Sequence, residues 1–209
     1  MLASLLLRIG ALGPLIFYGV IVAGGVMTPG YNHMTQHVSE LGQAGGPAAT
    51  LFNNGIMAVG GAMILGALGF LLGMRKLGGG LLMPLLAAVA IALFGASFIL
   101  GGLHPMPDPM HNAYNLVYAG VAAPLLAFLA MGDRSEVSGA KTLAVVSFLA
   151  SAVLLAIMMN LGGFNLVHKT DVGLWQRGFI AATTLWMLSA FLAIPGALAA
   201  KERKRSAAY

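Results

Sequence analysis

The sequence predicts an all-α membrane protein, a bundle of six transmembrane helices with both termini in the cytoplasm. Three observations lead to this prediction. Of the 209 residues, 59% are hydrophobic and only 8% are charged, whereas soluble domains carry about 25% charged residues. Six apolar stretches are each close to the length of about 20 residues that crosses a bilayer. Basic residues, finally, gather on one side of the predicted membrane.

The six stretches contain no charged side chain, and most of the connections between them are short or rich in Gly and Pro. They cover residues 9–27, 51–73, 80–103, 113–131, 142–164 and 178–199. The first is interpreted as a retained helix, because no small-residue cleavage pattern follows it as in a signal peptide. Only the external loop 28–50 is long enough to hold structure of its own. We therefore expect one membrane domain over residues 1–209.

Lysine and arginine predict the orientation, because cytoplasmic loops are enriched in both. With the N-terminus inside, the cytoplasmic segments hold nine of the eleven basic residues, namely Arg8, Arg75, Lys76, Arg134, Lys141, Lys201, Arg203, Lys204 and Arg205. Lys169 and Arg177 lie on the other side. The net charge of +5 thus reflects topology and does not indicate nucleic acid as a partner. The expected partners are membrane lipids, and a homo-oligomer or a larger membrane complex stays open.

Glycine is unusually common, with 29 residues. In a bilayer, small residues let helix backbones approach closely, and this close packing holds helices together. Gly69 and Gly73 have the required spacing in the second span, and Gly60, Gly61 and Gly66 extend the pattern. A dimer seam would use such a stripe too, but a six-helix bundle has many internal contacts to fill. We expect internal packing.

Polar residues gather at the non-cytoplasmic end. It receives all five histidines and three of the six acidic residues, namely His33, His37, His104, His111 and His168 with Glu40, Asp108 and Asp171. This distribution predicts a polar pocket that opens outward, although ordinary polar loops would produce it as well. The candidate pocket residues are His33, His37, Asn53, Asn54, His111, Asn112, Asn115, Gln176 and Arg177. A buried amide in lipid needs a partner, so at least one of Asn53 and Asn54 should face the bundle interior.

In the first external loop, a helix would place His33 and His37 one turn apart, with Glu40 one turn further on. Two imidazoles and a carboxylate can bind a divalent metal. A short amphipathic helix in the membrane interface would show the same pattern, and the zinc-protease motif H-E-x-x-H is absent. Ser39 could cap a helix end.

In the second external loop, three prolines stiffen the segment that carries Asp108 and His111. Asp108 is expected to cap the next helix, with Pro109 in its first position. In the third loop, Gln176 and Arg177 could reach back to Glu40 or Asp108, or Arg177 could extend toward lipid phosphate.

Three classes of function fit these residues. The first is a binding protein whose pocket holds a lipid, quinone or other small ligand, or a subunit of a membrane complex. The second is a zinc-dependent hydrolase of lipid amides or esters, with His37, His104 and His111 as ligands, Asp108 or Glu40 as general base and Ser39 as orienting donor. The third, a haem protein, needs two histidines that face each other. The absence of cysteine excludes thiolate sites and cysteine nucleophiles.

Three segments together resemble the DUF998 family. They are Ser39-Glu40-Leu41-Gly42 with Leu51-Phe52-Asn53-Asn54-Gly55, then His104-Pro105-Met106-Pro107-Asp108-Pro109 with His111, and finally Gly173-Leu174-Trp175-Gln176-Arg177-Gly178 with Leu185-Trp186. The segment Leu103-His104-Pro105 departs from the aromatic-Pro pair usual in the family. The resemblance implies a six-helix protein of bacterial or archaeal cytoplasmic membranes. It implies no reaction, because the function of the family is uncharacterised.

Overall fold

The computed structural model describes residues 1–207, with Asn112 and Ala113 described by their backbone alone. Its long helices are α1 (Leu2–Met27), α2 (Gly46–Lys76), α3 (Leu82–Leu103), α4 (Ala119–Met131), α5 (Ser138–Met158) and α6 (Val172–Ser206). The 3₁₀ helices η1 (Val38–Gly42), η2 (Pro109–Tyr118) and η3 (Ser135–Val137) lie between them. Within residues 1–207, six helical segments are long and apolar enough to cross a membrane, with η2 joined to α4 and η3 joined to α5. The predicted all-α fold with six spans is confirmed, and the chain is a multi-pass membrane protein.

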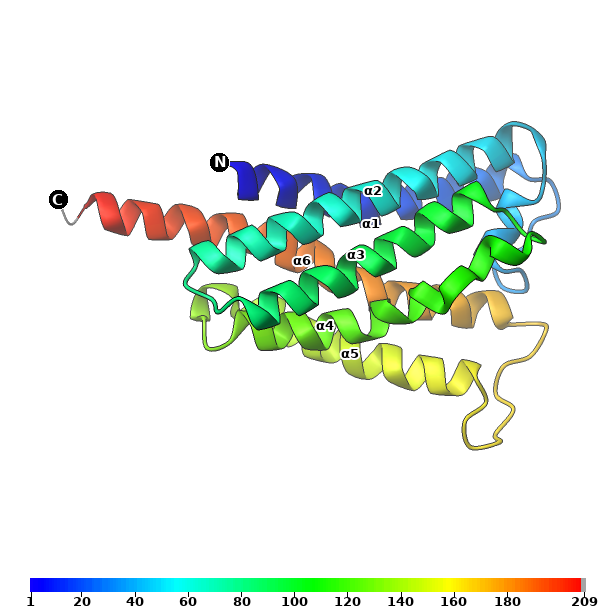
Figure 1. Cartoon of the computed structure of the whole chain (residues 1–209). Coiled ribbons are helices and arrows are strands. Elements are labelled where there is room, and N and C mark those ends of the chain that lie inside the picture. Colours follow the sequence, from blue (N-terminus) through cyan, green and yellow to red (C-terminus); the bar gives the residue numbers. More distant parts are fainter. Residues whose placement is uncertain (208–209) are drawn as a thin grey trace.

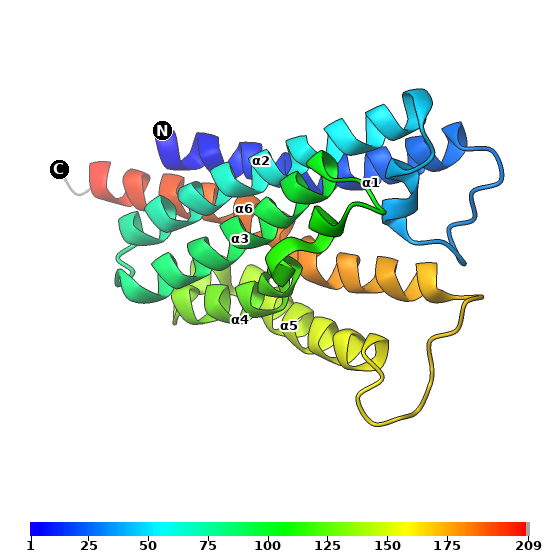
Figure 2. The same ribbon diagram turned by 45° about the vertical axis from the view of Figure 1, so that its right-hand side comes forward.

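Successive helices run in opposite directions and pack side by side, and α6 returns to lie against α1 and α5 (Figure 1). Both termini therefore lie at one end of the bundle, here called the terminal end, together with the turns 77–81 and 132–137. The opposite end carries the segments 28–45, 104–118 and 159–171 and is here called the histidine end (Figure 2). All five histidines lie in these three segments. The predicted gathering of histidines at one end is confirmed.

Glycines bring α1, α2 and α3 close together. A Cβ atom at Gly10 would collide with Gly66 and with the Phe191 ring, and one at Gly60 would collide with the Gly95 carbonyl. Further along α2, Gly69 lies against Leu7 and Gly73 lies against Ile194. Internal packing is thus confirmed for Gly60, Gly66, Gly69 and Gly73, whereas Gly61 faces open space.

Helix boundaries differ from the prediction at both ends of the bundle. The fifth span was expected to continue to residue 164, but α5 ends at Met158. Asn160, Gly162 and Gly163 have positive φ angles of 53°, 108° and 75°, and left-handed residues of this kind end a helix. In addition, α1 begins at Leu2, α2 at Gly46 and α6 at Val172, so each starts before the predicted span.

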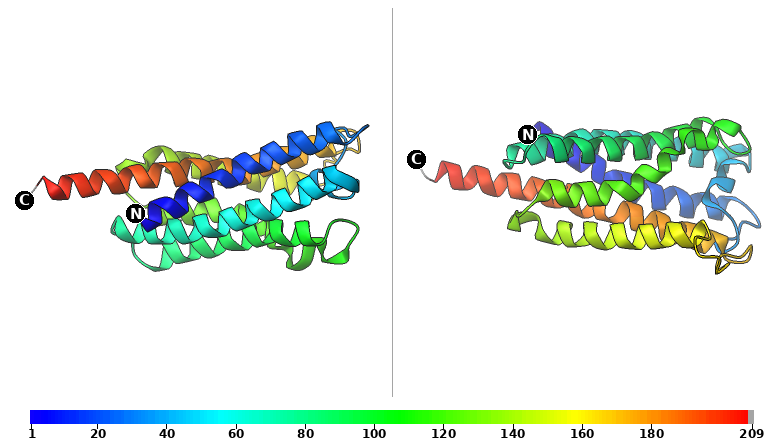
Figure 3. Two further views of the ribbon diagram at one scale, coloured as in Figure 1. Left: turned by 90° about the horizontal axis from the view of Figure 1, so that it is seen from above. Right: turned by 60° about the horizontal axis from the view of Figure 1, so that its bottom comes forward.

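The fourth span is not one regular α-helix over residues 113–131. Its first part is the 3₁₀ helix η2, in which Tyr114 and Asn115 have positive φ angles of 62° and 52°. Only residues 119–131 form the α-helix α4, which packs against α5. By contrast, η2 packs mainly against α3 and lies away from α5 (Figure 3). The fourth and fifth spans therefore separate toward the histidine end.

Candidate functional site

A cavity of about 470 Å³ lies inside the histidine end, among α1, α2, α3, α5, α6, η1 and η2. Its lining extends along α6 from Gln176 to Thr183 and along α3 from Gly101 to Phe94. Seven residues of α-helix span about 10 Å, at about 1.5 Å per residue. The cavity thus reaches from the loops into the membrane-spanning part of the bundle.

The deep part of the cavity is apolar. Phe98 stacks edge-to-face on both Phe17 and Phe94, with ring centroids 5.1 Å apart in each pair, and all three line the cavity. Two hydroxyl groups reach the same region, but Ser97 Oγ donates to the Phe94 carbonyl at 2.6 Å and Thr183 Oγ1 donates to the carbonyls of its own helix. Because their hydrogens are already used, these hydroxyls add little donor capacity to the floor.

One side of the cavity lies between η2 and α5. Leu116, Val117 and Tyr118 line it from η2, and Leu155 and Met158 line it from α5. Tyr118 and Met159, which also line the cavity, are 43% and 53% exposed. The cavity therefore opens sideways where the two spans separate.

The mouth of the cavity is polar and contains five of the predicted site residues, His37, Ser39, His111, Asn115 and Gln176. The Val38 N–H donates to Gln176 Oε1 at 2.7 Å, which links η1 to the first turns of α6. Ser39 Oγ donates to Met106 Sδ at 3.3 Å, which links η1 to the second loop. Side chains from three separate segments thus form one rim.

Arg177 does not line the cavity, and it links the first external loop to α6 by hydrogen bonds. Its guanidinium donates to the Gln36 carbonyl at 3.0 Å, to the Tyr31 hydroxyl and to His33 Nδ1 at 3.1 Å. Burial and the Arg177 charge lower the pKa of His33, so its ring stays neutral and can accept this bond. Burial raises the pKa of the Tyr31 hydroxyl, which donates to the His37 carbonyl at 3.0 Å. Arg177 therefore binds the loop that contains Glu40 without pairing with Glu40 itself.

Glu40 has a local role in the same loop. One carboxylate oxygen accepts from the His37 N–H and the other accepts from Gln36 Nε2, both at 2.8 Å. Of the two adjacent asparagines, Asn53 donates to the Gly42 carbonyl at 3.2 Å, as expected for an amide that faces the bundle. Asn54 is exposed. The side chains of Glu40, Asn53 and Asn54 do not line the cavity.

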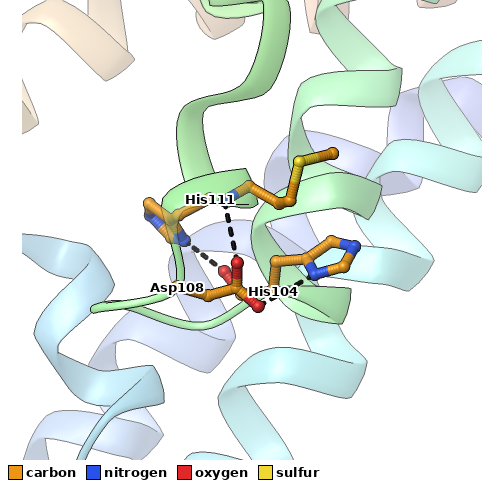
Figure 4. Close-up of polar contacts among 4 residues, drawn as sticks. His104, Asp108 and His111 are labelled. Atoms are coloured by element: carbon orange, nitrogen blue, oxygen red, sulfur yellow. Dashed lines mark hydrogen bonds and ion pairs between the residues drawn. The ribbon is translucent and has the colours of Figure 1, made fainter.

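Asp108 caps η2, as predicted. Its Oδ1 accepts from the Met110 N–H at 2.8 Å, and its Oδ2 lies 3.1 Å from His104 Nδ1 (Figure 4). These two bonds, the Met110 bond first, hold the pKa of Asp108 below its usual value. His111 Nδ1 donates to the His104 carbonyl at 2.8 Å. The loop is thus folded around its own polar groups.

The residues considered for zinc are not brought together as a ligand set. Residues 1–207, as described, contain no group of three His, Cys, Asp or Glu side chains that could hold a metal ion. The imidazoles of His104 and His111 point to opposite sides of Asp108 (Figure 4). His37 and His111 line the cavity, whereas His104 does not. The side chain of Asn112, a predicted pocket residue, lies outside the described part of the chain.

A comparison with known protein families matches most of the chain. The family model described as "Protein of unknown function (DUF998)" matches residues 11–193. The chain belongs to the DUF998 family. The match includes every cavity-lining residue, so the cavity lies within the region that defines this DUF998 protein. No curated protein and no solved structure matches the chain.

Sequence reasoning missed most of the residues that line the cavity of this DUF998 protein. They are mainly apolar residues of the spans, including Phe17, Phe52, Phe94, Phe98, Phe179 and Ile180. In an apolar span nothing distinguishes a side chain that lines a cavity from one that fills a core. Tyr31 was missed as well, although its position between α1 and the histidine pair of the same loop could have suggested a structural partner.

Proposed function

We propose that this DUF998 protein binds a membrane amphiphile, a molecule with a hydrocarbon chain and a polar headgroup. The chain would occupy the deep part of the cavity, and the headgroup would lie at the mouth. One observation carries the proposal. A single cavity has an aromatic floor inside the spans, a polar rim at the loops and a side opening between η2 and α5.

The size and walls of the cavity suit such a molecule. A volume of about 470 Å³ lies within the range of about 300–1,000 Å³ typical of small-molecule sites, which combine apolar walls with a few polar groups. The side opening matters because a hydrocarbon chain is dissolved in the bilayer and would enter from there rather than through water. Leu155 and Met158 form the α5 side of this entry.

The mouth favours an uncharged headgroup. No Asp, Glu, Lys or Arg is among the described residues that line the cavity. His111 donates its Nδ1 hydrogen to a carbonyl, so the Nε2 atom of the neutral ring is left as an acceptor. Gln176 accepts through Oε1, which leaves its NH₂ group as a donor. One donor and one acceptor suit a hydroxyl or carbonyl headgroup, as in a diacylglycerol or a quinone.

We place the protein in a bacterial or archaeal cytoplasmic membrane, with the terminal end in the cytoplasm. Nine of the eleven basic residues support this orientation. The chain has no cysteine, so single cysteines give an unambiguous label. In spheroplasts, a membrane-impermeant thiol reagent should label Gln43→Cys, at the histidine end, and leave Ser206→Cys unlabelled. The reverse pattern would contradict the orientation.

The binding proposal is tested by blocking the cavity from α5. Leu155→Trp enlarges a side chain that lines the cavity, whereas Val153→Trp makes the same kind of change at a residue that is 58% exposed and does not line this cavity. Wild-type protein purified in mild detergent should retain a neutral lipid, measured by organic extraction and mass spectrometry. Excess volume at a packed site costs about 1–3 kcal/mol, so Leu155→Trp should weaken retention about tenfold.

The control separates binding from folding. Val153→Trp should retain as much lipid as wild type, and both variants should melt at similar temperatures because each enlarges a side chain beside space. If Leu155→Trp retains the same lipid in the same amount, the cavity does not hold it and the proposal fails.

A further inference from the structure

A second cavity, of about 230 Å³, lies at the terminal end, far from the cavity of the proposed function. It is bounded by the turn after α2, by η3 and by the last turns of α6. The lining residues are Leu77, Arg134, Glu136, Ala200, Lys201 and Lys204. Three cations and one carboxylate therefore line this cavity.

The length of α6 explains how this cavity forms. The helix has 35 residues, and its last turns project beyond the other helices (Figure 3). Lys204 lies three residues after Lys201 and four residues after Ala200, and these two spacings bring side chains together on one face of an α-helix. That face packs toward η3, which follows Arg134.

Two of the three cations are held in position by backbone carbonyls. Arg134 Nη1 donates to the Met131 carbonyl at 2.9 Å, and its Nε donates to the Leu77 carbonyl at 3.4 Å. Lys201 Nζ donates to the Lys76 carbonyl at 2.8 Å. These bonds satisfy the last carbonyls of α2 and α4 and fix the charges at the cavity. A carbonyl carries no net charge, so the positive charge remains.

No carboxylate neutralises these cations in the structure. Among residues 1–207, the one ion pair within 4.0 Å joins His104 and Asp108, at the other end of the bundle. Glu136 lines the cavity but lies beyond this distance from Arg134, Lys201 and Lys204. Arg134, Lys201 and Lys204 line one cavity, and together they create a positive potential that attracts an anion.

The position of the cavity points to the kind of anion. Leu77 directly follows α2, and Arg134 lies three residues after the end of α4, where the spans leave the hydrocarbon region and lipid phosphates lie. Basic pockets between helices at this level bind anionic lipid headgroups, and an arginine matches the geometry of a phosphate. Leu77 and Ala200 add an apolar wall beside the cations.

From this arrangement we propose that the terminal-end cavity binds the phosphate of an anionic phospholipid, with Arg134, Lys201 and Lys204 as its cationic ligands. This site is independent of the amphiphile site, since the two cavities share no residue. Free phosphate would satisfy the same cations, so the test separates it from the lipid.

The test compares two charge reversals on one helix. Lys204→Glu changes a cation that lines the terminal-end cavity, and Arg203→Glu changes the neighbouring cation, which does not line it. Binding of phosphatidylglycerol and of phosphatidylcholine to the full-length protein is measured by native mass spectrometry. Wild type should prefer phosphatidylglycerol, Lys204→Glu should weaken its binding about tenfold or more, and Arg203→Glu should weaken it less than about threefold.

Three outcomes would overturn the proposal. Equal losses in the two variants would mean that only general surface charge attracts the lipid. Equal binding of the two lipids by wild type would mean that no anionic site exists. Displacement of phosphatidylglycerol by excess inorganic phosphate would assign the site to free phosphate. Arg134 is left unchanged because its bonds to α4 also support folding.

Discussion

The α1–α2–α3 side of the bundle and the η2–α5 side are both apolar, yet they pack in opposite ways. On the first side, glycines bring backbones into contact, as Gly10 and Gly66 do. On the second, the spans separate and leave a cavity lined by Leu155 and Met158. Hydrophobicity alone therefore does not decide which side closes. The size of the residues on the facing surfaces does.

Helix α5 shows this difference along a single face. The small residues Ala140, Ala144, Ser147 and Ser151 follow one another at helical spacing and are buried. The same face continues with Leu155 and Met158, which line the cavity. Small residues let α5 approach its neighbours near the terminal end, and large residues hold it away near the histidine end. The polar links at the mouth, Val38 to Gln176 and Ser39 to Met106, join η1 to α6 and to the second loop and do not involve α5.

The largest effect is expected where backbones already touch. Gly66→Leu would drive a side chain into Gly10 and Phe191, so unfolding should be easier by about 3 kcal/mol or more, because neither backbone can move aside. Gly61→Leu, in open space, should change stability by less than about 0.5 kcal/mol. Thermal melting and membrane yield measure both. If the two variants behave alike, the close packing of this side is not real.

A smaller loss of stability is expected where Arg177 binds the first external loop. Arg177→Met removes the bonds to Gln36, Tyr31 and His33. Hydrogen bonds to a charged group contribute about 1.5–3 kcal/mol to stability. Arg177→Met should therefore lower the free energy of unfolding by about this amount, and the melting temperature should fall. Lys169→Met, an exposed cation at the same end, is the control and should leave melting unchanged. Equal melting of the two variants would show that Arg177 does not hold the loop.

The smallest effect concerns the cap of η2. The pKa of Asp108 is lowered by the Met110 N–H and by His104, so its stabilisation is present above the unfolded pKa, which is about 3.9, and is lost as the pH falls through the lower folded value. Asp108→Asn should melt below wild type near neutral pH, and the two curves should converge in acid. If the difference in melting temperature between the two proteins were the same at every pH, the charge of the Asp108 carboxylate would not stabilise the cap.

Much of this architecture could be predicted from the sequence. Six spans follow from apolar length, and the gathering of histidines follows from which connections lie at the same end. The Asp108 cap follows from Asp-Pro at a helix start, and the internal position of Gly66 follows from small-residue spacing.

The remaining features depend on conformation and on which helix faces meet. The left-handed Tyr114 and Asn115 that accompany the 3₁₀ helix η2, and those that end α5, have no strong local signal beyond Asn and Gly. Arg177 binds carbonyls and Tyr31 rather than a carboxylate, and backbone carbonyls cannot be selected from sequence. The cavity floor consists of phenylalanines that elsewhere would simply be core.

The most direct test uses a diacylglycerol with a photoactivatable diazirine in its acyl chain, reconstituted with the wild-type protein and mapped by peptide mass spectrometry. Adducts at Leu155, Met158 or Phe179, which line the cavity, are the result that amphiphile binding predicts. The outward residues Leu149 and Val153, 57% and 58% exposed, report ordinary contact with the bilayer. Adducts confined to those outward residues would contradict the account.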